Sequence, residues 1–231
     1  MAANTHSLAL VRASSQYANT PDANDLDFGT GSFTVELWYK VTSLPGFSGL
    51  ICKDLSDNDG FQLNGTTSFV FRCMSAAGVD ATSSFTLTDG GVWHHIACVR
   101  NGTTLKVYLD LVEVASGTDN ARNITNTAVL GLGTYRSVDV VNHHWDGLID
   151  EVRVWNVERT LAQITANYQK DVTGQSGLVA YWKLNNSDTD ETGLGHTLTR
   201  GGGAGFSTTV PFGDYANGAR GYKSLLGVGQ A

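Results

Sequence analysis

The stretch from residue 32 to residue 41 most constrains the fold, because its side chains alternate with the two-residue period of a β-strand. One face of this strand would carry Phe33, Val35, Leu37 and Tyr39, and the other Thr34, Glu36, Trp38 and Lys40. Similar runs recur about every ten residues, which is typical of an all-β domain. We predict further strands at 7–11, 16–18, 48–53, 59–63, 68–74, 127–133, 147–155, 178–184 and 195–200.

A hairpin is predicted in the middle of the chain, where the strands 92–100 and 103–110 flank Asn101 and Gly102. Asn-Gly is the residue pair that most readily adopts the two positive φ angles of a type I′ turn. We therefore expect a type I′ turn at these two residues, and antiparallel pairing of the two strands on either side of it.

One short helix is predicted near 161–169. Thr160 and Gln163 have the spacing of a capping box, in which each side chain hydrogen-bonds the backbone N–H of the other residue. Leu161, Ile164 and Tyr168 would then lie on one helical face. We expect this helix to cover an edge or an end of the β-structure.

The composition is consistent with one large β domain. The 231 residues include 27 glycines and 3 prolines, which suits many short strands joined by tight turns. A hydrophobic content of 41% excludes a disordered chain. We predict one domain over 1–210 and a Gly-rich C-terminal arm over 211–231. The cysteines lie in separate apolar runs and are expected to be buried free thiols: Cys52, Cys73 and Cys98.

Charge argues against nucleic acid as a partner. The chain has 15 basic and 22 acidic residues, a formal net charge of −7, and no clustered Lys/Arg face of the kind that duplex binding needs. Anionic membrane surfaces are disfavoured for the same reason, and no apolar run is long enough for membrane insertion. The first residues also lack a secretory signal, so we expect synthesis in the cytoplasm.

Five motifs in a fixed order resemble those of a known family. They are LDFGTGSFTVELW at 26–38, WHHIACV at 93–99, NGTTLKVYLD at 101–110, WDGLIDEVRVW at 145–155 and GLVAYWKL at 177–184. Together they resemble laminin-G-like modules of the concanavalin A-like lectin/glucanase superfamily, over about residues 7–210. The resemblance implies an all-β, two-sheet antiparallel jelly-roll sandwich. It departs at Asp110-Leu111, where the family usually has Asp-Gly, so the type of this turn is open.

The superfamily also contains glycoside hydrolases, whose active strand resembles Glu-x-Asp-x-x-Glu. Hydrolysis with retention needs two carboxylates about 5 Å apart. Around Asp150 the corresponding positions hold Leu148 and Arg153, neither of which can act as the acid or the nucleophile. Asp150 and Glu151 are neighbours in the predicted strand and would point to opposite faces. We therefore expect a protein that is not an enzyme.

Calcium is the metal that the resemblance implies. Members of the family commonly hold one Ca²⁺ at a loop rim with carboxylates and backbone carbonyls. By resemblance Asp150 is the candidate ligand, with Asp22 and Asp25 in a loop as its possible partners. The alternative is that Asp150 caps a backbone turn without a metal.

A ligand-binding surface is expected near a polar loop before the 147–155 strand. Binding a sugar needs an exposed aromatic ring, because stacking uses the face of the ring. Tyr135, His144 and Trp145 lie in or beside this loop and are the candidate ligand-binding residues. The alternative is that Trp145 belongs to the rim of the core.

Two classes of function remain open. The first is a non-catalytic structural protein on the surface of a virion or another particle. Such modules also occur in virion proteins of bacteriophages. The chain would have protein partners in a homo-oligomeric or particle assembly, and its Gly-rich arm would lie across a neighbour. The second is a calcium-dependent carbohydrate-binding or adhesion module of an extracellular or cell-surface system. A glycan is a possible ligand in both.

Overall fold

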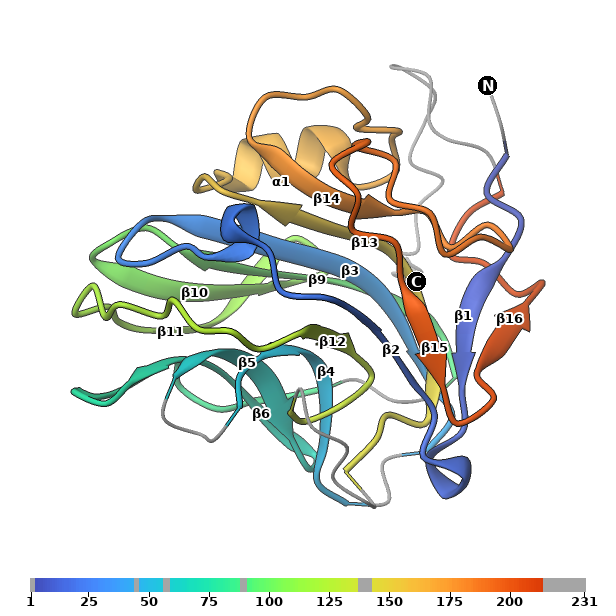
Figure 1. The fold of residues 1–231 in the computed structure, drawn as a ribbon, viewed down its shortest axis with the longest axis horizontal. Coiled ribbons are helices and arrows are strands. Elements are labelled where there is room, and N and C mark those ends of the chain that lie inside the picture. Colours follow the sequence, from blue (N-terminus) through green and yellow to red (C-terminus); the bar gives the residue numbers. More distant parts are fainter. Residues whose placement is uncertain (1–2, 44–45, 56–58, 88–90, 137–142, 214–231) are drawn as a thin grey trace, which may run out of the picture.

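The computed structural model describes residues 3–43, 46–55, 59–87, 91–136 and 143–213. Two antiparallel sheets of eight strands each lie face to face in this part of the chain (Figure 1). The predicted all-β two-sheet sandwich with one short helix is thereby confirmed. No helix in the described ranges is long and apolar enough to cross a membrane.

The first sheet is built around three long central strands. Its members are β1 (Ser7–Leu10), β3 (Phe33–Val41), β9 (Trp93–Arg100), β10 (Thr104–Leu109), β11 (Val112–Thr118), β13 (Gly147–Trp155), β14 (Leu178–Trp182) and β16 (Gly205–Ser207). Their order across the sheet is β11-β10-β9-β3-β13-β1-β16, and β14 also pairs with β13.

The second sheet lies opposite. It contains β2 (Tyr17–Thr20), β4 (Ser48–Lys53), β5 (Gly60–Gly65), β6 (Ser68–Ser75), β7 (Gly78–Ala81), β8 (Phe85–Thr86), β12 (Leu130–Leu132) and β15 (Thr199–Gly201). The order is β15-β2-β12-β4-β5-β6-β7, and β8 also pairs with β6. The prediction missed β7, β8, β11 and β16. Three of these are very short, and β11 is exposed along most of its length, so its sequence has no apolar face.

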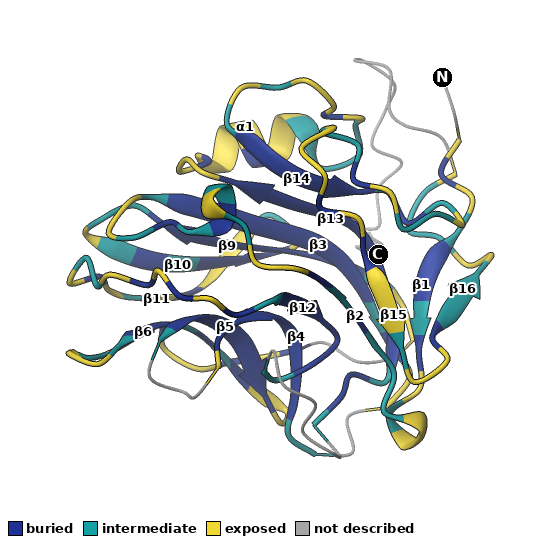
Figure 2. Cartoon of the chain, viewed as in Figure 1, coloured by how far each residue is buried: buried dark blue, intermediate teal, exposed yellow. Residues whose placement is uncertain are grey.

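The alternation of side chains along β3 sets the core. Phe33, Val35, Leu37 and Tyr39 all point between the sheets and are fully buried. Phe33 lies at the centre of an aromatic group, with ring centroids 4.6 Å from Phe28 and 5.0 Å from Phe61. Burying one such side chain stabilises the fold by about 1.5–3 kcal/mol. Thr34, Glu36 and Trp38, on the other face of β3, are buried as well. The first sheet is therefore covered on both sides (Figure 2).

Helix α1 (Leu161–Asn167) provides part of that cover. The predicted capping box is present: the Thr160 side chain accepts from the Gln163 backbone N–H, and the Gln163 side chain accepts in return. Ile164 is fully buried against the outer face of β9 and β10. Leu161, predicted on the same face, is 38% exposed, because the short helix turns only its middle toward the sheet.

The two consecutive positive φ angles occur in the second hairpin turn and not in the first, where the sequence predicted them. Asn101 does not have a positive φ angle, so the expected type I′ turn at Asn101-Gly102 is wrong. The Asn101 side chain instead accepts from the backbone N–H groups of Thr103 and Thr104 and holds a longer loop. The two consecutive positive φ angles occur at Asp110 (48°) and Leu111 (68°). This turn keeps the backbone form of Asp-Gly without the glycine.

The cysteines and the C-terminal segment complete the fold. Cys52, Cys73 and Cys98 are free and buried, as expected, and burial raises the pKa of each thiol. The Asn4 backbone N–H donates to the Gly213 carbonyl at 2.9 Å, so the described chain begins and ends at one place. The predicted division between the 1–210 domain and the 211–231 arm stays a prediction, since most of the arm lies outside the described residues.

Candidate functional site

Polar side chains lie on the outer face of the second sheet. Strand pairing places Gly131, Cys52, Gln62 and Arg72 next to one another across β12, β4, β5 and β6. Their sequence neighbours, Leu63 among them, point into the core. Since successive residues of a strand face opposite ways, the row points away from the core.

Four side chains of this face form a chain of hydrogen bonds. Gln62 Nε2 donates to Asp54 Oδ2 at 2.6 Å, and Asn64 Nδ2 donates to Gln62 Oε1. Arg72 Nη1 in turn donates to Asn64 Oδ1 at 2.9 Å. A carboxylate can only accept and a guanidinium can only donate, so the two ends fix the orientation of both amides. We call these four residues the polar relay.

The polar relay is buried at one end and accessible at the other. Asp54, Gln62 and Asn64 are fully buried, whereas Arg72 is half-buried. Buried polar groups must be hydrogen-bonded to avoid a desolvation penalty of about 1–3 kcal/mol each. The relay satisfies the two amides from within the chain and directs the guanidinium toward the accessible side of the sheet.

The loop after β12 folds back over this face because two glycines leave room for it. A Cβ added at Gly49 would lie 2.2 Å from the Thr134 carbonyl oxygen, and one at Gly131 would lie 2.6 Å from Thr134 Cγ2. Gly49 pairs with Asn64 across β4 and β5, so both belong to the same face. The loop therefore holds Tyr135 beside the polar relay, where its hydroxyl interacts electrostatically with Arg72 and Asp54.

Tyr135 belongs to a small aromatic cluster at this rim. Its ring centroid lies 4.6 Å from that of Phe47 and 5.5 Å from that of His143, and both neighbours are edge-on. The Arg136 guanidinium carbon lies 5.0 Å from the Tyr135 ring centroid. All four side chains are half-buried, and partial burial is the main cause that raises the pKa of Tyr135. We call Phe47, Tyr135 and His143 the aromatic rim.

The other two predicted ligand-binding residues lie beneath the surface. Trp145 is fully buried in the core and packs edge-on against Tyr39, with ring centroids 5.8 Å apart. Its ring presents no face to solvent, so the alternative placement of Trp145 in the core is the one observed. His144 is also fully buried and stacks on Tyr17 at 5.8 Å. Of the three predicted residues, only Tyr135 is accessible.

The predicted metal ligands are dispersed. Asp22 pairs with the buried Lys53 at 2.8 Å, and Asp25 lies 3.0 Å from His196 Nε2. Asp150 lies in β13 and accepts from Asn4 Nδ2 at 2.8 Å. No group of three or more His, Cys, Asp or Glu side chains in the described ranges is arranged to hold a metal ion. Asp22 and Asp25 are therefore not assembled with Asp150.

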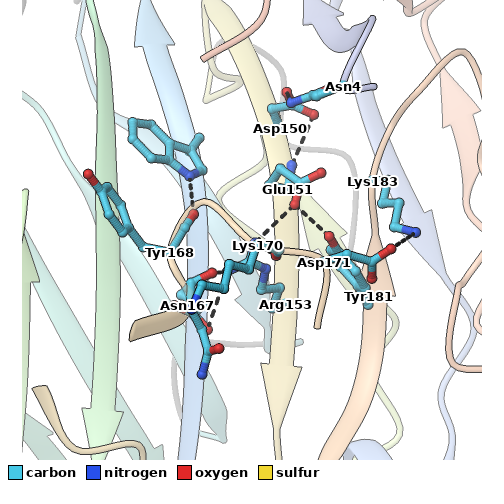
Figure 3. A network of polar contacts seen from close by, with 12 residues as sticks. Asn4, Asp150, Glu151, Arg153, Asn167, Tyr168, Lys170, Asp171, Tyr181 and Lys183 are labelled. Carbon is cyan, nitrogen blue, oxygen red and sulfur yellow. Dashed lines mark hydrogen bonds and ion pairs between the residues drawn. The ribbon is translucent and has the colours of Figure 1, made fainter. Parts of the chain in front are cut away.

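A β-bulge changes the local geometry at Asp150. The pairing of β13 with β3 shifts register between Asp150 and Arg153, and Glu151 has a positive φ of 52°. Ile149 and Val152 both point into the core, so Asp150 and Glu151 both lie on the outer side (Figure 3). The expectation that they would face opposite ways is wrong, because it assumed an unbroken strand.

Asp150 and Asn4 could hold a hard cation, because they offer oxygen atoms in a buried setting. Burial, followed by the neighbouring Glu151 charge, raises the pKa of Asp150 well above 3.8. Asn4 Oδ1 is buried and has no hydrogen-bond partner among the described residues. The unpartnered Asn4 oxygen beside the Asp150 carboxyl group fits the oxygen ligation of Ca²⁺. Asp150 Oδ1 meanwhile accepts from the Glu151 backbone N–H at 3.0 Å, which is the metal-free capping role left open by the sequence.

Next to Asp150, the outer face of the first sheet holds a closed ionic network. Arg153 Nη2 donates to Glu151 Oε2 at 3.0 Å, and Arg153 Nη1 lies 4.0 Å from Glu36 Oε1. The Tyr181 hydroxyl donates to Glu151 at 2.6 Å, and Trp155 Nε1 donates to Glu36 at 2.8 Å (Figure 3 shows the part around Glu151). All five side chains are fully buried. We call them the ionic network.

Sequence reasoning found Tyr135 but missed the polar relay. The signal was present in β5, where Phe61 and Leu63 alternate with Gln62 and Asn64. Such alternation predicts a core face and a polar outer face. That Arg72 lies beside Gln62 depends on strand register, which no local pattern specifies.

Comparison with known proteins gives a family and a fold. A family model described as the concanavalin A-like lectin/glucanases superfamily, Laminin_G_3, matches residues 12–165. No curated protein matches the chain. A crystal structure of a Bacteroides ovatus protein described as a "putative carbohydrate binding protein" aligns with a TM-score of 0.67 and 18% identity, covering 92% of this chain and 62% of that one.

Two further structures are more distant. Domains LG4-5 of the mouse laminin α1 chain align with a TM-score of 0.46 and 12% identity, covering 60% of this chain and 40% of that one. The heptameric SAP-like pentraxin of Limulus polyphemus gives 0.46 and 14%, covering 68% and 83%. This chain thus spans less than two thirds of the Bacteroides and laminin chains. At these identities the likeness concerns the fold alone.

Proposed function

This chain belongs to the concanavalin A-like lectin/glucanase superfamily, and we propose that it is a non-catalytic recognition module that binds carbohydrate on the outer face of its second sheet. The observation that carries the proposal is the position of the polar relay beside the aromatic rim. A sugar ring has hydroxyl groups at its edge and apolar C–H groups on its faces. It therefore needs both hydrogen-bonding side chains and an aromatic surface from its receptor.

Each part of the site has a chemical role in this proposal. The other N–H groups of the half-buried Arg72 would donate to sugar oxygen atoms, and the buried amides of Gln62 and Asn64 would hold the guanidinium in place. The Tyr135 ring would contact the sugar, supported edge-on by Phe47 and His143. Side chains fixed by packing lose little entropy on binding, which favours affinity.

The carboxylates of β13 support a non-catalytic function. Leu148 and Arg153 occupy the positions where a retaining hydrolase of this fold would have acidic residues. Glu151, brought to the same side as Asp150 by the bulge, is fully buried and hydrogen-bonded to Arg153 and Tyr181. It therefore has no open path to a glycosidic bond.

Calcium is proposed as a structural ion at Asp150 and Asn4, on the opposite sheet from the sugar site. The ion would supply positive charge to a buried carboxylate. Thermal melting in about 5 mM CaCl₂ and in EDTA tests this proposal, because that concentration exceeds a dissociation constant in the millimolar range. We expect Ca²⁺ to raise Tm in the wild type and to have no effect in Asn4→Ala/Asp150→Asn. An equal Tm in CaCl₂ and EDTA for the wild type would contradict the site.

The role on the surface of a virion or another particle stays a prediction. It rests on the Gly-rich arm, most of which lies outside the described residues. A homo-oligomer would support it, and light scattering after gel filtration measures that state directly. Sugar binding is compatible with either setting.

A glycan array of the purified protein tests the main proposal. We expect binding to a defined set of glycans and a loss of about tenfold in affinity for Tyr135→Ala, equivalent to about 1.4 kcal/mol. Tyr135→Phe keeps the ring and should bind within about twofold of the wild type. Leu194→Ala, at an exposed position, is the surface control. A blank array, or Tyr135→Ala with wild-type affinity, would contradict the proposal.

A further inference from the structure

Unlike three other buried or half-buried arginines, Arg72 has no acidic partner among the described residues. Arg100 pairs with Asp119 at 2.8 Å and Arg122 pairs with Asp80 at 2.9 Å. Arg153 likewise pairs with Glu151. Among the described residues Arg72 forms no ion pair, and the one hydrogen bond of its guanidinium goes to the neutral Asn64 amide. Its charge is therefore not neutralised by direct contact with an acidic side chain in the described part of the chain.

The polar relay explains how this charge is held in place. Asp54, the acidic end of the relay, is separated from Arg72 by two amide groups. Each amide carries its oxygen toward Arg72 and its nitrogen toward Asp54. Such an aligned chain orients the guanidinium while leaving its remaining N–H groups directed elsewhere. An arginine fixed in this way is suited to bidentate binding of a planar or tetrahedral anion.

The surroundings of Arg72 add positive charge and an aromatic surface. Arg136 lies over the Tyr135 ring, and Arg12 and Arg136 are both near enough to His143 to lower its pKa, after the larger effect of burial. Two further guanidinium groups therefore lie near the aromatic rim. The Arg72 guanidinium beside a ring-binding surface matches a sugar that carries an acidic substituent.

We propose that Arg72 binds the anionic group of an acidic saccharide whose sugar ring lies against Tyr135. This inference rests on the proposed function and narrows its ligand class. A uronic acid carboxylate and a sulfate ester share the required chemistry, because each presents two or more oxygen atoms to the guanidinium fork. The polar relay positions Arg72, and the saccharide supplies the missing negative partner.

The test compares matched ligands and matched variants by calorimetry. The ligands are an oligogalacturonate, its neutral methyl ester and a sulfated galactan oligosaccharide of the same length. The variants are Arg72→Gln, which can still donate to Asn64, and Lys106→Gln, at a half-buried position of the first sheet that pairs with Glu113. Both change the net charge by one unit. Melting curves verify folding, and Arg72→Lys keeps the charge without the fork.

We expect the wild type to bind at least one acidic oligosaccharide at least tenfold more tightly than the methyl ester. Arg72→Gln should remove this preference, Arg72→Lys should reduce it, and Lys106→Gln should change it less than twofold. Comparison of carboxylate with sulfate then identifies the anion. Equal losses in Arg72→Gln and Lys106→Gln would overturn the inference, because the attraction would be non-specific. Equal binding of neutral and acidic sugars overturns it but leaves the proposed function standing. Absence of binding to every saccharide overturns both.

Discussion

The outer faces of the two sheets treat charge in opposite ways. On the first sheet, Arg153 contacts both Glu151 and Glu36, and its Nη1 and Nη2 groups also donate to the carbonyl groups of Asn167 and Lys170, in and after α1. The chain itself closes this face. On the second sheet, two amides lie between Asp54 and Arg72 in the chain of hydrogen bonds, and the cationic end is half-buried.

This difference separates a structural polar network from a candidate binding site. Burial alone does not distinguish them, since Gln62 and Asn64 are as deeply buried as Glu36 and Glu151. What differs is whether each charge meets its opposite within the chain. A buried charge with a direct partner makes the fold depend on that partner. A charge that is fixed in place without a direct partner of opposite sign is available to an external ligand.

The largest effect is expected from breaking the ionic network with Arg153→Met. The substitution leaves Glu151 buried without its counter-charge and removes one of the cationic neighbours of Glu36, which should cost about 3–5 kcal/mol of unfolding free energy. Arg200→Met is the control, because Arg200 pairs with Asp188 near the surface and should cost about 1 kcal/mol or less. Equilibrium unfolding in urea measures both. Similar losses of unfolding free energy in the two variants would show that the ionic network stabilises the fold no more than a surface ion pair does.

An intermediate effect is expected where the loop meets the second sheet. In Gly49→Ala the new Cβ collides with the Thr134 backbone, so the loop must move and carry Tyr135 with it. We expect a loss of about 1–3 kcal/mol in stability together with loss of sugar binding. Gly205→Ala has open space around its Cβ and should leave both properties nearly unchanged. Retention of sugar binding by a folded Gly49→Ala protein would show that the loop position is unimportant.

The smallest effect concerns the pH dependence of the first face. Burial would raise the pKa of Glu36, but His95, Arg153 and Trp155 outweigh it and lower the pKa below 4.5. The resulting stabilisation is present above the unfolded-state pKa and is lost as the pH falls through the folded-state value. Glu36→Gln should therefore flatten the fall of stability below about pH 4.5, by at most about 1.4 kcal/mol per pH unit. Urea unfolding across a range centred on about pH 4.5 measures this dependence. If Glu36 does not titrate as described, the stabilities of the wild type and of Glu36→Gln will fall with the same slope against pH.

Prediction from sequence succeeded where a local pattern determines the outcome. The alternation at Phe33 to Tyr39 identified the inward face of β3, and the capping box located the start of α1. It failed where backbone geometry departs from the regular form, as in the bulge at Glu151 and the turn at Asp110. Neither residue type requires a positive φ, so the sequence held no signal for it.

The candidate site shows the same boundary. Tyr135 was found because an aromatic residue in a polar loop is a local feature. The association of Asp54 with Arg72 was not found, since it depends on the register of three strands and on two glycines that admit the loop. For Trp145 the sequence left both the loop surface and the rim of the core open, and its burial in the core depends on tertiary packing that no local pattern specifies.

The hydrogen bond between the Asn4 N–H and the Gly213 carbonyl has a consequence for protein engineering. The polypeptide enters and leaves the sandwich at a single point, with its entry and exit separated by 2.9 Å between the bonded atoms. Proteins with adjacent ends tolerate circular permutation and insertion into host loops. Residues 4–213 can therefore be inserted as a unit into an exposed loop of another protein without moving the ends of that loop apart. The polar relay would then lie on a sheet face rather than at the point of insertion.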